Sequence, residues 1–247
     1  MFESTHKPEF DKCFIDADSI LYRIAATTDS LTQAKGHFDT SLKAIMRDTD
    51  SVQGFVAVKG KGNFRFEIAE DYKGNRSSSD MDPKMKAMLD DLYQYAWDTD
   101  CFQSHNCEAD DVVSIWATEA LELENTFVIA HIDKDIDMIP GWHYNFNKKN
   151  LYYVEPDDAH LKLCKQMLTG DSADNIKGLK GVGEKTALKI LDGVSADDAL
   201  NVVIDQWRKK YPRDWKVHLE KCFNLLYMRR SWDDFRALTL EEVFGAP

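Results

Sequence analysis

The chain has 247 residues, of which 43% are hydrophobic, which is enough for one sizeable core with a small appended lobe. No apolar run approaches the roughly 20 residues that span a bilayer, and the N-terminus lacks a signal-peptide pattern, so we expect no membrane contact and a cytoplasmic protein. The formal net charge of −12 argues against contacts with phosphate, which require Lys and Arg.

The charge is unevenly distributed along the chain. Residues 1–175 contain 18 Lys and Arg against 32 Asp and Glu, whereas residues 176–230 contain 12 against 7. An acidic body with a basic C-terminal part is typical of a metal site beside a phosphate-binding element, although an acidic enzyme with one solvated basic face has the same balance. The five cysteines form no CxxC pair, and we expect reduced, buried thiols.

Predicted strands alternate with predicted helices. Apolar strands are predicted at residues 13–15, 52–58 and 126–132, the second of them ending before the glycines at 60 and 62. Helices are predicted after residue 18 and at 82–95, 109–123, 157–168 and 184–191, and the rest to about residue 230 also looks helical. The alternation predicts an α/β fold with a mostly parallel sheet flanked by helices.

Acidic residues cluster where predicted strands end and helices begin. The ends of parallel strands share one edge of a sheet, where ligands bind, so separate elements deliver carboxylates to one place. Hard cations such as Mg²⁺ relieve the repulsion between carboxylates, and two of them promote phosphodiester hydrolysis. Helix capping explains any single one of these acids, but their combined placement favours metal binding. The acids are Asp16, Asp18, Glu108, Asp110, Asp111, Asp133, Asp135 and Asp137.

Residues 170–187, GDSADNIKGLKGVGEKTA, form the most specific stretch of the chain. The Gly-Val-Gly sequence lets the backbone approach a ligand closely, and the following helix directs free N–H groups outwards, which favours phosphate. The stretch is typical of a helix–hairpin–helix element that grips nucleic-acid backbone without reading sequence; an ordinary Gly-rich turn is the alternative. The residues placed for such contacts are Lys180, Gly181, Val182, Gly183 and Lys185.

The order of these motifs resembles the 5′-nuclease family, which includes phage exonucleases, flap endonucleases and the N-terminal domain of bacterial DNA polymerase I. The matching segments, within about residues 13–192, are FIDADSILYR, FRFEIAEDYKGNR, CEADDVV, IDKDIDM and LTGDSADNIKGLKGVGEKTALKIL. The resemblance implies a PIN-like domain over residues 1–155, with a helical arch at about 72–107. It implies a helix–three-turn–helix DNA-binding lobe, with the C-terminal helices, over 156–247. Without a polymerase domain, the chain is most similar to a phage 5′-3′ exonuclease.

The resemblance also implies a two-metal active site that takes Mg²⁺ or Mn²⁺. The implied metal ligands are Asp16, Glu108, Asp110, Asp111, Asp133, Asp135, Asp171 and Asp174, and the first six are also catalytic. Lys73 and Arg76 would hold the scissile phosphate at the base of the arch, and Tyr72 would stack on a terminal base. The Gly-Val-Gly loop would grip duplex phosphates, with a bound K⁺. The expected substrates are DNA with 5′ ends or flaps and RNA–DNA hybrids, and the protein is expected to be a monomer in the cytoplasm, the host's if phage-encoded.

The sequence departs from the family at the end of the second strand. The family usually has an aspartate there, but residues 56–65, VAVKGKGNFR, contain no acid. We therefore expect one metal site to be weaker. Asp18 is either a substitute for the missing acid or a helix cap.

Two other functions fit part of the chain. Asp16 and Asp18 also suit a haloacid-dehalogenase-type phosphatase, as covalent nucleophile and general acid, although residues 170–191 then have no role. A DNA-structure-binding protein that has lost catalysis with the missing aspartate is the other alternative.

Overall fold

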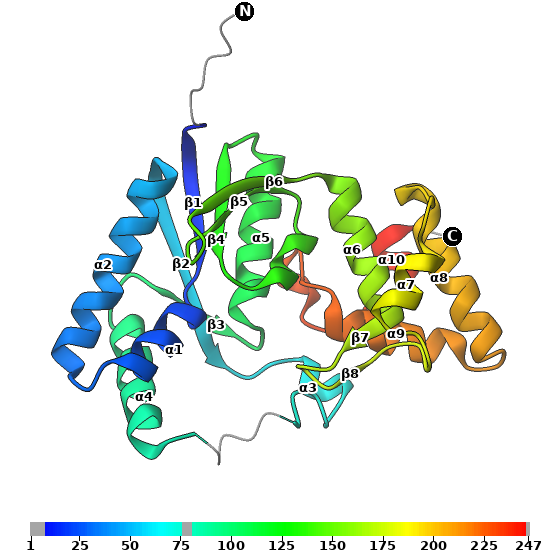
Figure 1. Ribbon diagram of the computed structural model, residues 1–247, viewed down its shortest axis with the longest axis horizontal. Coiled ribbons are helices and arrows are strands. Elements are labelled where there is room, and N and C mark those ends of the chain that lie inside the picture. The colour runs from blue at the N-terminus through cyan, green and yellow to red at the C-terminus, as the bar shows by residue number, and fades with distance from the viewer. Residues whose placement is uncertain (1–7, 76–80, 246–247) are drawn as a thin grey trace, which may run out of the picture.

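A six-stranded sheet lies at the centre of the computed structural model, which describes residues 8–75 and 81–245 (Figure 1). The strands are arranged in the order β3-β2-β1-β4-β5-β6; all neighbours are parallel except β6, which runs antiparallel to β5. Their bounds are β1 Phe10–Asp16, β2 Ser51–Lys61, β3 Phe102–His105, β4 Phe127–His131, β5 Gly141–Asn145 and β6 Asn150–Val154. The predicted mostly parallel α/β sheet is confirmed.

Helices cover both faces of the sheet (Figure 1). Cys13 and Ile15 of β1 enter one core with α1 (Asp18–Thr27), α2 (Leu31–Thr49) and α4 (Pro83–Trp97). Phe14 and, on β4, Ile129 enter the other core with α5 (Ala109–Glu122). Burial on both faces is the reason why the central strands are apolar throughout instead of alternating with polar residues.

The C-terminal helices form a lobe beside α5 (Figure 1). Leu163 and Phe223 of this lobe belong to the same apolar core as Phe14 of the sheet, so one core runs through both parts. The lobe consists of α6 Pro156–Thr169, the hairpin β7 Gly170–Asp171 and β8 Ile176–Lys177, α7 Glu184–Ile190, α8 Ala196–Lys210, α9 Trp215–Leu226 and α10 Leu240–Phe244. None of the helices among the described residues is long and apolar enough to cross a bilayer.

The structure extends the predicted second strand and adds three strands to the central sheet, besides the short hairpin β7–β8. β2 continues through Gly60 to Lys61. Glycine does not end the strand here; it lets β3 pack close to β2, since any side chain at Gly60 would collide with the backbone carbonyl of Ser104. β3, β5 and β6 were not predicted. Within the segment expected to form the arch, α4 packs on α1 and α2 through Leu92 and Tyr93.

A buried ion pair joins the sheet domain to the lobe. Arg65, at the start of α3 (Arg65–Ile68), contacts both carboxylate oxygens of Asp111 on α5, at 2.6 and 2.8 Å. Arg65 also donates to the carbonyls of Leu225 and Tyr227, and Asp111 accepts the backbone N–H of Arg229. Burial alone would raise the pKa of Asp111, but its pairing with Arg65 holds that pKa below the usual value.

We expect Asp111→Asn to destabilise the fold by about 3–5 kcal/mol, because it leaves the buried Arg65 guanidinium without its counter-charge. The matched control is Asp110→Asn, one residue away. Asp110 has no ion-pair partner among the described residues, and burial raises its pKa, so its replacement should leave stability unchanged or higher. Urea unfolding measures both variants. Unchanged stability of Asp111→Asn would contradict the prediction.

Candidate active site

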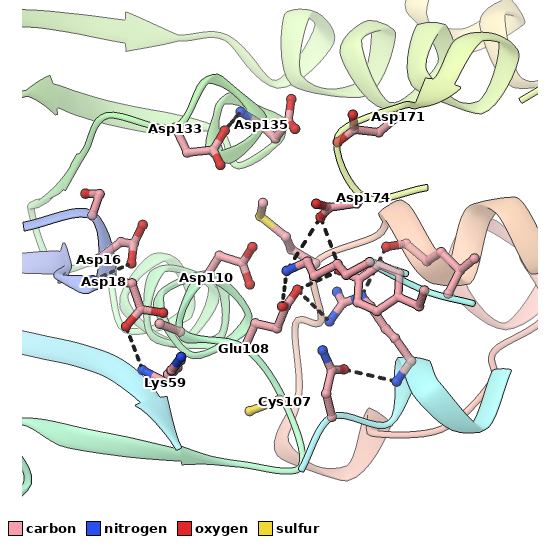
Figure 2. A pocket seen from close by; sticks show the side chains of 18 of the residues that line it. Asp16, Asp18, Lys59, Cys107, Glu108, Asp110, Asp133, Asp135, Asp171 and Asp174 are labelled. Atoms are coloured by element: carbon pink, nitrogen blue, oxygen red, sulfur yellow. Dashed lines mark hydrogen bonds and ion pairs between the residues drawn. The ribbon is translucent and has the colours of Figure 1, made fainter. Parts of the chain in front are cut away.

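One cleft of about 1050 Å³ lies at the carboxyl ends of the parallel strands (Figure 2). It brings together every predicted metal ligand except Asp111, and adds Asp18. The acids that line it are Asp16, Asp18, Glu108, Asp110, Asp133, Asp135, Asp171 and Asp174. The basic residues that line it are Lys59, Arg65 and Lys73. The cleft is therefore strongly acidic, as the strand-end pattern predicted.

Asp18 faces the cleft and does not cap α1. The N-cap of α1 is Ala17, and no side chain caps that end. One carboxylate oxygen of Asp18 accepts the backbone N–H of Lys59 on β2 at 2.8 Å and the hydroxyl of Tyr93 on α4 at 3.1 Å. Residues of three elements thus hold Asp18 next to Asp16 and beside β2, a strand that contains no acid.

The acids after β4 are presented by a 3-10 helix, η2 (Lys134–Met138). Asp133 caps η2 by accepting the N–H of Asp135 at 2.8 Å. Asp135 in turn accepts the Nε2 group of Gln166 on α6 at 2.9 Å, while Gln166 Oε1 has no hydrogen-bond partner among the described residues. Gln166 is a site residue that the sequence did not reveal, because a glutamine within a helix carries no signal of its own.

Lys73 lies between two acids that come from different elements of the cleft, Glu108 and Asp174. Its ammonium group pairs with Glu108 and lies 3.5 Å from Asp174. The hydroxyl of Tyr72 donates to Glu108 at 2.8 Å, and its ring lies edge-on against Phe66. Because Tyr72 is only 3% exposed, the predicted stacking on a base requires the ring to become accessible. Arg76 lies outside the described residues.

Asp111 and Asp137 do not line the cleft. Both oxygens of Asp111 are engaged by Arg65, which turns this carboxylate into the protein interior. The structure therefore differs from the expectation that Asp111 binds metal, and places it as the residue that orients the start of α5. Asp137 instead lies beside two histidines, His131 and His143.

The Gly-Val-Gly loop is open to its surroundings. Gly181 has a φ of +91°, a conformation that favours glycine, whereas Gly183 has an extended backbone. A Cβ atom at either position would meet nothing within 4 Å, so internal packing does not require glycine there. Lys180 and Lys185 beside the loop are exposed. The loop thus leaves room for a close-lying ligand.

The crowded carboxylates raise one another's pKa values. Burial and then repulsion from Asp18 raise the pKa of Asp16 to about 8. Burial, with repulsion from Glu108, raises the pKa of Asp110, and burial with repulsion from Asp133 raises that of Asp135. A cation would relieve this repulsion, and a set made only of oxygen donors suits Mg²⁺ or Mn²⁺. The residues present therefore fit divalent metal ions.

Comparison of the sequence with protein-family models shows to which family the chain belongs. A family model described as the 5′-3′ exonuclease, N-terminal resolvase-like domain matches residues 12–151. The chain belongs to this 5′-3′ exonuclease family. Among curated relatives, DNA polymerase I of Bacillus caldotenax is 28% identical over 203 residues, covering 72% of this chain and 23% of the relative. The enzyme of Thermus aquaticus is 26% identical over 253 residues, covering 92% and 28%. The chain thus spans about a quarter of the length of these relatives.

Solved structures of exonuclease family members and flap nucleases have a similar fold. A bacteriophage T5 protein crystallised with metal ions superposes with a TM-score of 0.66 at 19% identity, covering 89% of this chain and 88% of the other. The T5 flap endonuclease in complex with DNA and metal ions gives 0.60 at 15% identity, covering 87% and 98%. The catalytic core of Rad2 with a DNA substrate gives 0.50 at 13% identity, covering 97% and 89%. The fold is therefore the PIN-like α/β fold.

Asp16 should make the metal-free protein less stable as the pH rises from about 4 to 8. The raised pKa of Asp16 means that the folded chain keeps a proton which the unfolded chain releases above about pH 4. Asp16→Asn should therefore raise the melting temperature in a chelator at pH 8 by about 3 °C or more, the shift that roughly 1 kcal/mol produces in a chain of this size.

The control is Asp29→Asn, an exposed acid that does not line the cleft, which should leave the melting temperature unchanged. Added Mn²⁺ should stabilise the unmodified protein at pH 8 and stabilise Asp16→Asn less. An Asp16→Asn variant that melts no higher than the unmodified protein in a chelator at pH 8 would contradict this account.

Proposed function

We propose that this chain is a metal-dependent 5′-3′ exonuclease and flap endonuclease that hydrolyses phosphodiester bonds in DNA. The observation that carries the proposal is the single cleft lined by eight carboxylates, with the Lys73 ammonium between its two sides. Family membership supports the reaction class. The DNA and metal ions bound by the T5 flap endonuclease, and the DNA substrate bound by Rad2, support a DNA substrate for this chain.

Two divalent ions, Mg²⁺ or Mn²⁺, would be held by the acids of the cleft. Asp16, Glu108 and Asp110 lie on one side, and Asp133, Asp135, Asp171 and Asp174 on the other. Bound there, the ions supply an activated water and stabilise the leaving oxygen. The chain itself fixes the position of each carboxylate. The acids lie at the end of β1, at the start of α5, at η2, and on β7 and the turn that follows it.

Lys73 and Arg76 would bind the scissile phosphate. Burial opposes the charge on Lys73, but Glu108 and Asp174 raise its pKa, so it remains a cation in the cleft. A phosphate that enters between Glu108 and Asp174 offers Lys73 a replacement partner of the same charge. Tyr72, beneath this pair, would stack on a terminal base after its ring is exposed.

The basic C-terminal part would hold the DNA duplex. The open surface over Gly181 and Gly183, with Lys180 and Lys185 on either side of the loop, suits backbone phosphates and reads no sequence. We place the catalytic domain at residues 1–155, with an arch at about 72–107, and the DNA-binding lobe at 156–247. A K⁺ ion at the loop, action on RNA–DNA hybrids and a monomeric state belong to the same proposal.

Asp135→Asn should lower the rate of cleavage of a 5′-flap DNA by at least about a hundredfold, because it removes anionic charge from the metal site while DNA binding persists. Quenched-flow cleavage with Mg²⁺ and a mobility-shift assay measure the two properties separately. Near-normal cleavage by Asp135→Asn would refute the assignment. Binding of flap DNA without cleavage by the unmodified protein would support the catalytically weakened alternative.

We further propose that Asp18 replaces the missing second-strand aspartate as a metal ligand. Its carboxylate is fixed by the N–H of Lys59, on the strand that lacks the acid, and by Tyr93. Only one of its two oxygens accepts these hydrogen bonds, which leaves the other for an ion.

Asp18→Asn should weaken one of two Mn²⁺ sites about tenfold or more in the DNA-free protein, because hard-cation affinity depends on the number of anionic ligands. The asparagine oxygen can still accept from Lys59 and Tyr93, so the fold should be preserved. Calorimetric titration with Mn²⁺ measures the affinity, with Asp29→Asn as control. Identical binding by Asp18→Asn would show that Asp18 has only a structural role.

A further inference from the structure

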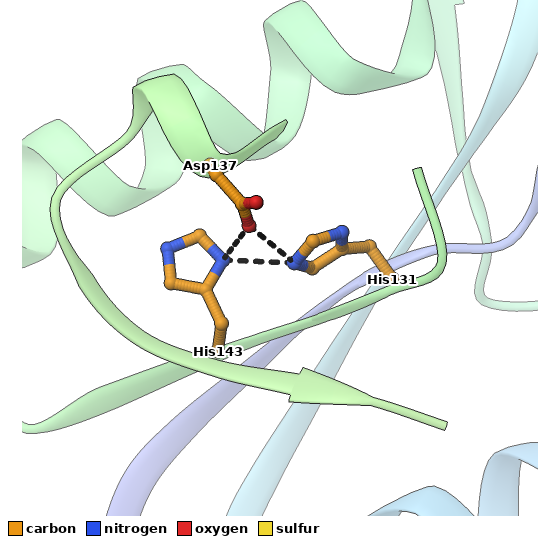
Figure 3. A group of neighbouring side chains, drawn as sticks. All are labelled: His131, Asp137 and His143. Carbon is orange, nitrogen blue, oxygen red and sulfur yellow. Dashed lines mark hydrogen bonds and ion pairs between the residues drawn. The ribbon is translucent and has the colours of Figure 1, made fainter. Parts of the chain in front are cut away.

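Three side chains that do not line the cleft meet beside η2 (Figure 3). His131 ends β4, Asp137 lies on η2, and His143 lies on β5. The two histidines are almost completely buried, at 1% and 0% exposure, and the Asp137 side chain is 29% exposed. In the described part of the chain, no other three such donor groups lie within 4.8 Å of one another.

The hydrogen bonds of the two rings determine where their protons lie. His131 Nδ1 is 2.6 Å from the carbonyl oxygen of Asp133, and His143 Nε2 is 2.8 Å from that of Ile139. A carbonyl oxygen only accepts, so both of these nitrogens carry a hydrogen. In neutral rings the other nitrogens, His131 Nε2 and His143 Nδ1, then direct lone pairs at each other across 2.8 Å. Two facing lone pairs repel, so this arrangement calls for a positive centre beside them.

The spacing of the three donor atoms suits a transition-metal ion. His131 Nε2 and His143 Nδ1 are 2.8 Å apart, and each is 3.9 Å from Asp137 Oδ1. The point equidistant from the corners of this triangle lies about 2.1 Å from each, which matches zinc–nitrogen and zinc–oxygen bond lengths of about 2.0–2.2 Å. The hydroxyl of Tyr152 lies 2.7 Å from Asp137 Oδ1 and 3.4 Å from His131 Nε2, where it offers a fourth donor.

The surroundings of the three residues resemble those of metal-binding histidines. Each ring donates its outer N–H to a backbone carbonyl, which fixes the ring and its tautomer, as is usual for histidines that bind metals. Lys162 lies 3.4 Å from the second oxygen of Asp137, which leaves Oδ1 directed at the rings. Imidazole nitrogen favours Zn²⁺, Co²⁺ or Ni²⁺, in contrast to the oxygen-only cleft.

We propose that His131, Asp137 and His143 form a second metal site, of the zinc type and distinct from the nuclease cleft. The carbonyl that accepts from His131 belongs to Asp133, and Asp137 shares η2 with Asp135. An ion at this site therefore fixes the segment that presents two acids to the cleft. The proposed metal site does not depend on the proposed nuclease activity.

The test uses the full chain, which is first stripped of metal ions. Millimolar Mg²⁺ is then added to fill sites made of oxygen donors, and the protein is titrated with Co²⁺. We expect one Co²⁺ per chain, with the visible absorption of a low-coordinate site, displaced by Zn²⁺. His143→Gln should abolish the band, and Asp137→Asn should weaken Co²⁺ binding about tenfold or more. Asp135→Asn, on the same 3-10 helix but facing the cleft, is the matched control and should keep the band.

Absence of the band in the unmodified protein would overturn the proposal. A band that persists in both His143→Gln and Asp137→Asn, or that is lost in Asp135→Asn, would equally overturn it. If His143→Gln does not fold, Asp137→Asn decides the question, because this partly exposed residue can be replaced by an isosteric amide that still accepts from Tyr152.

Discussion

The shape of the cleft depends on the buried ion pair between Arg65 and Asp111. Asp111 also accepts the backbone N–H of Glu108 at 3.1 Å, so the carboxylate that Arg65 holds in the interior fixes the start of α5, from which Glu108 and Asp110 reach the cleft. The same guanidinium binds two carbonyls near the end of α9, so the lobe is fixed to the sheet domain at this point. An isolated buried pair often contributes little, since desolvation offsets the attraction, but here backbone groups satisfy the remaining donors and acceptors. The pair therefore sets the orientation of α5 and the position of the lobe together.

In contrast to this stabilising pair, the cleft contains more acidic side chains than its basic residues can balance. Asp16, Asp110 and Asp135 have raised pKa values, whereas the pKa of Asp111 is lowered, although Asp110 and Asp111 are adjacent. The difference lies in the partners: Asp111 is paired with Arg65, whereas Asp110 has no ion-pair partner among the described residues and is repelled by Glu108 and Asp111. Buried charges that destabilise a folded protein occur at functional sites, where a bound ligand of opposite charge removes the destabilisation. Metal binding and folding are for that reason linked in this protein, because the charged forms of Asp16, Asp110 and Asp135 lower stability until a cation binds.

The sequence was sufficient to predict the helices and strands that have a strong local pattern. β1, β4 and α5 have continuous apolar runs and were predicted, and the acids that follow them were placed at one edge of the sheet. β3 has only four residues with one buried side chain, and β5 and β6 contain polar and aromatic residues at the sheet margin, so these strands gave no clear pattern. Asp111 was expected in the cleft because helical spacing puts it on the same face as Glu108. Its partner Arg65 is 46 residues away in the sequence, and no local rule reveals such a pair.

The two histidines were missed for a related reason. They are 12 residues apart, and they meet only because β4 and β5 are neighbouring parallel strands, one of which was not predicted. Asp135 and Asp137 were expected to act together, since both follow the same buried strand. In a 3-10 helix, however, three residues complete one turn, so residues two apart point in different directions. One short helix thus directs Asp135 to an all-oxygen cleft and Asp137 to a pair of imidazoles. Because oxygen donors favour Mg²⁺ and imidazole favours Zn²⁺, the two sides of η2 would select different ions, and each ion would fix the segment on which the other depends.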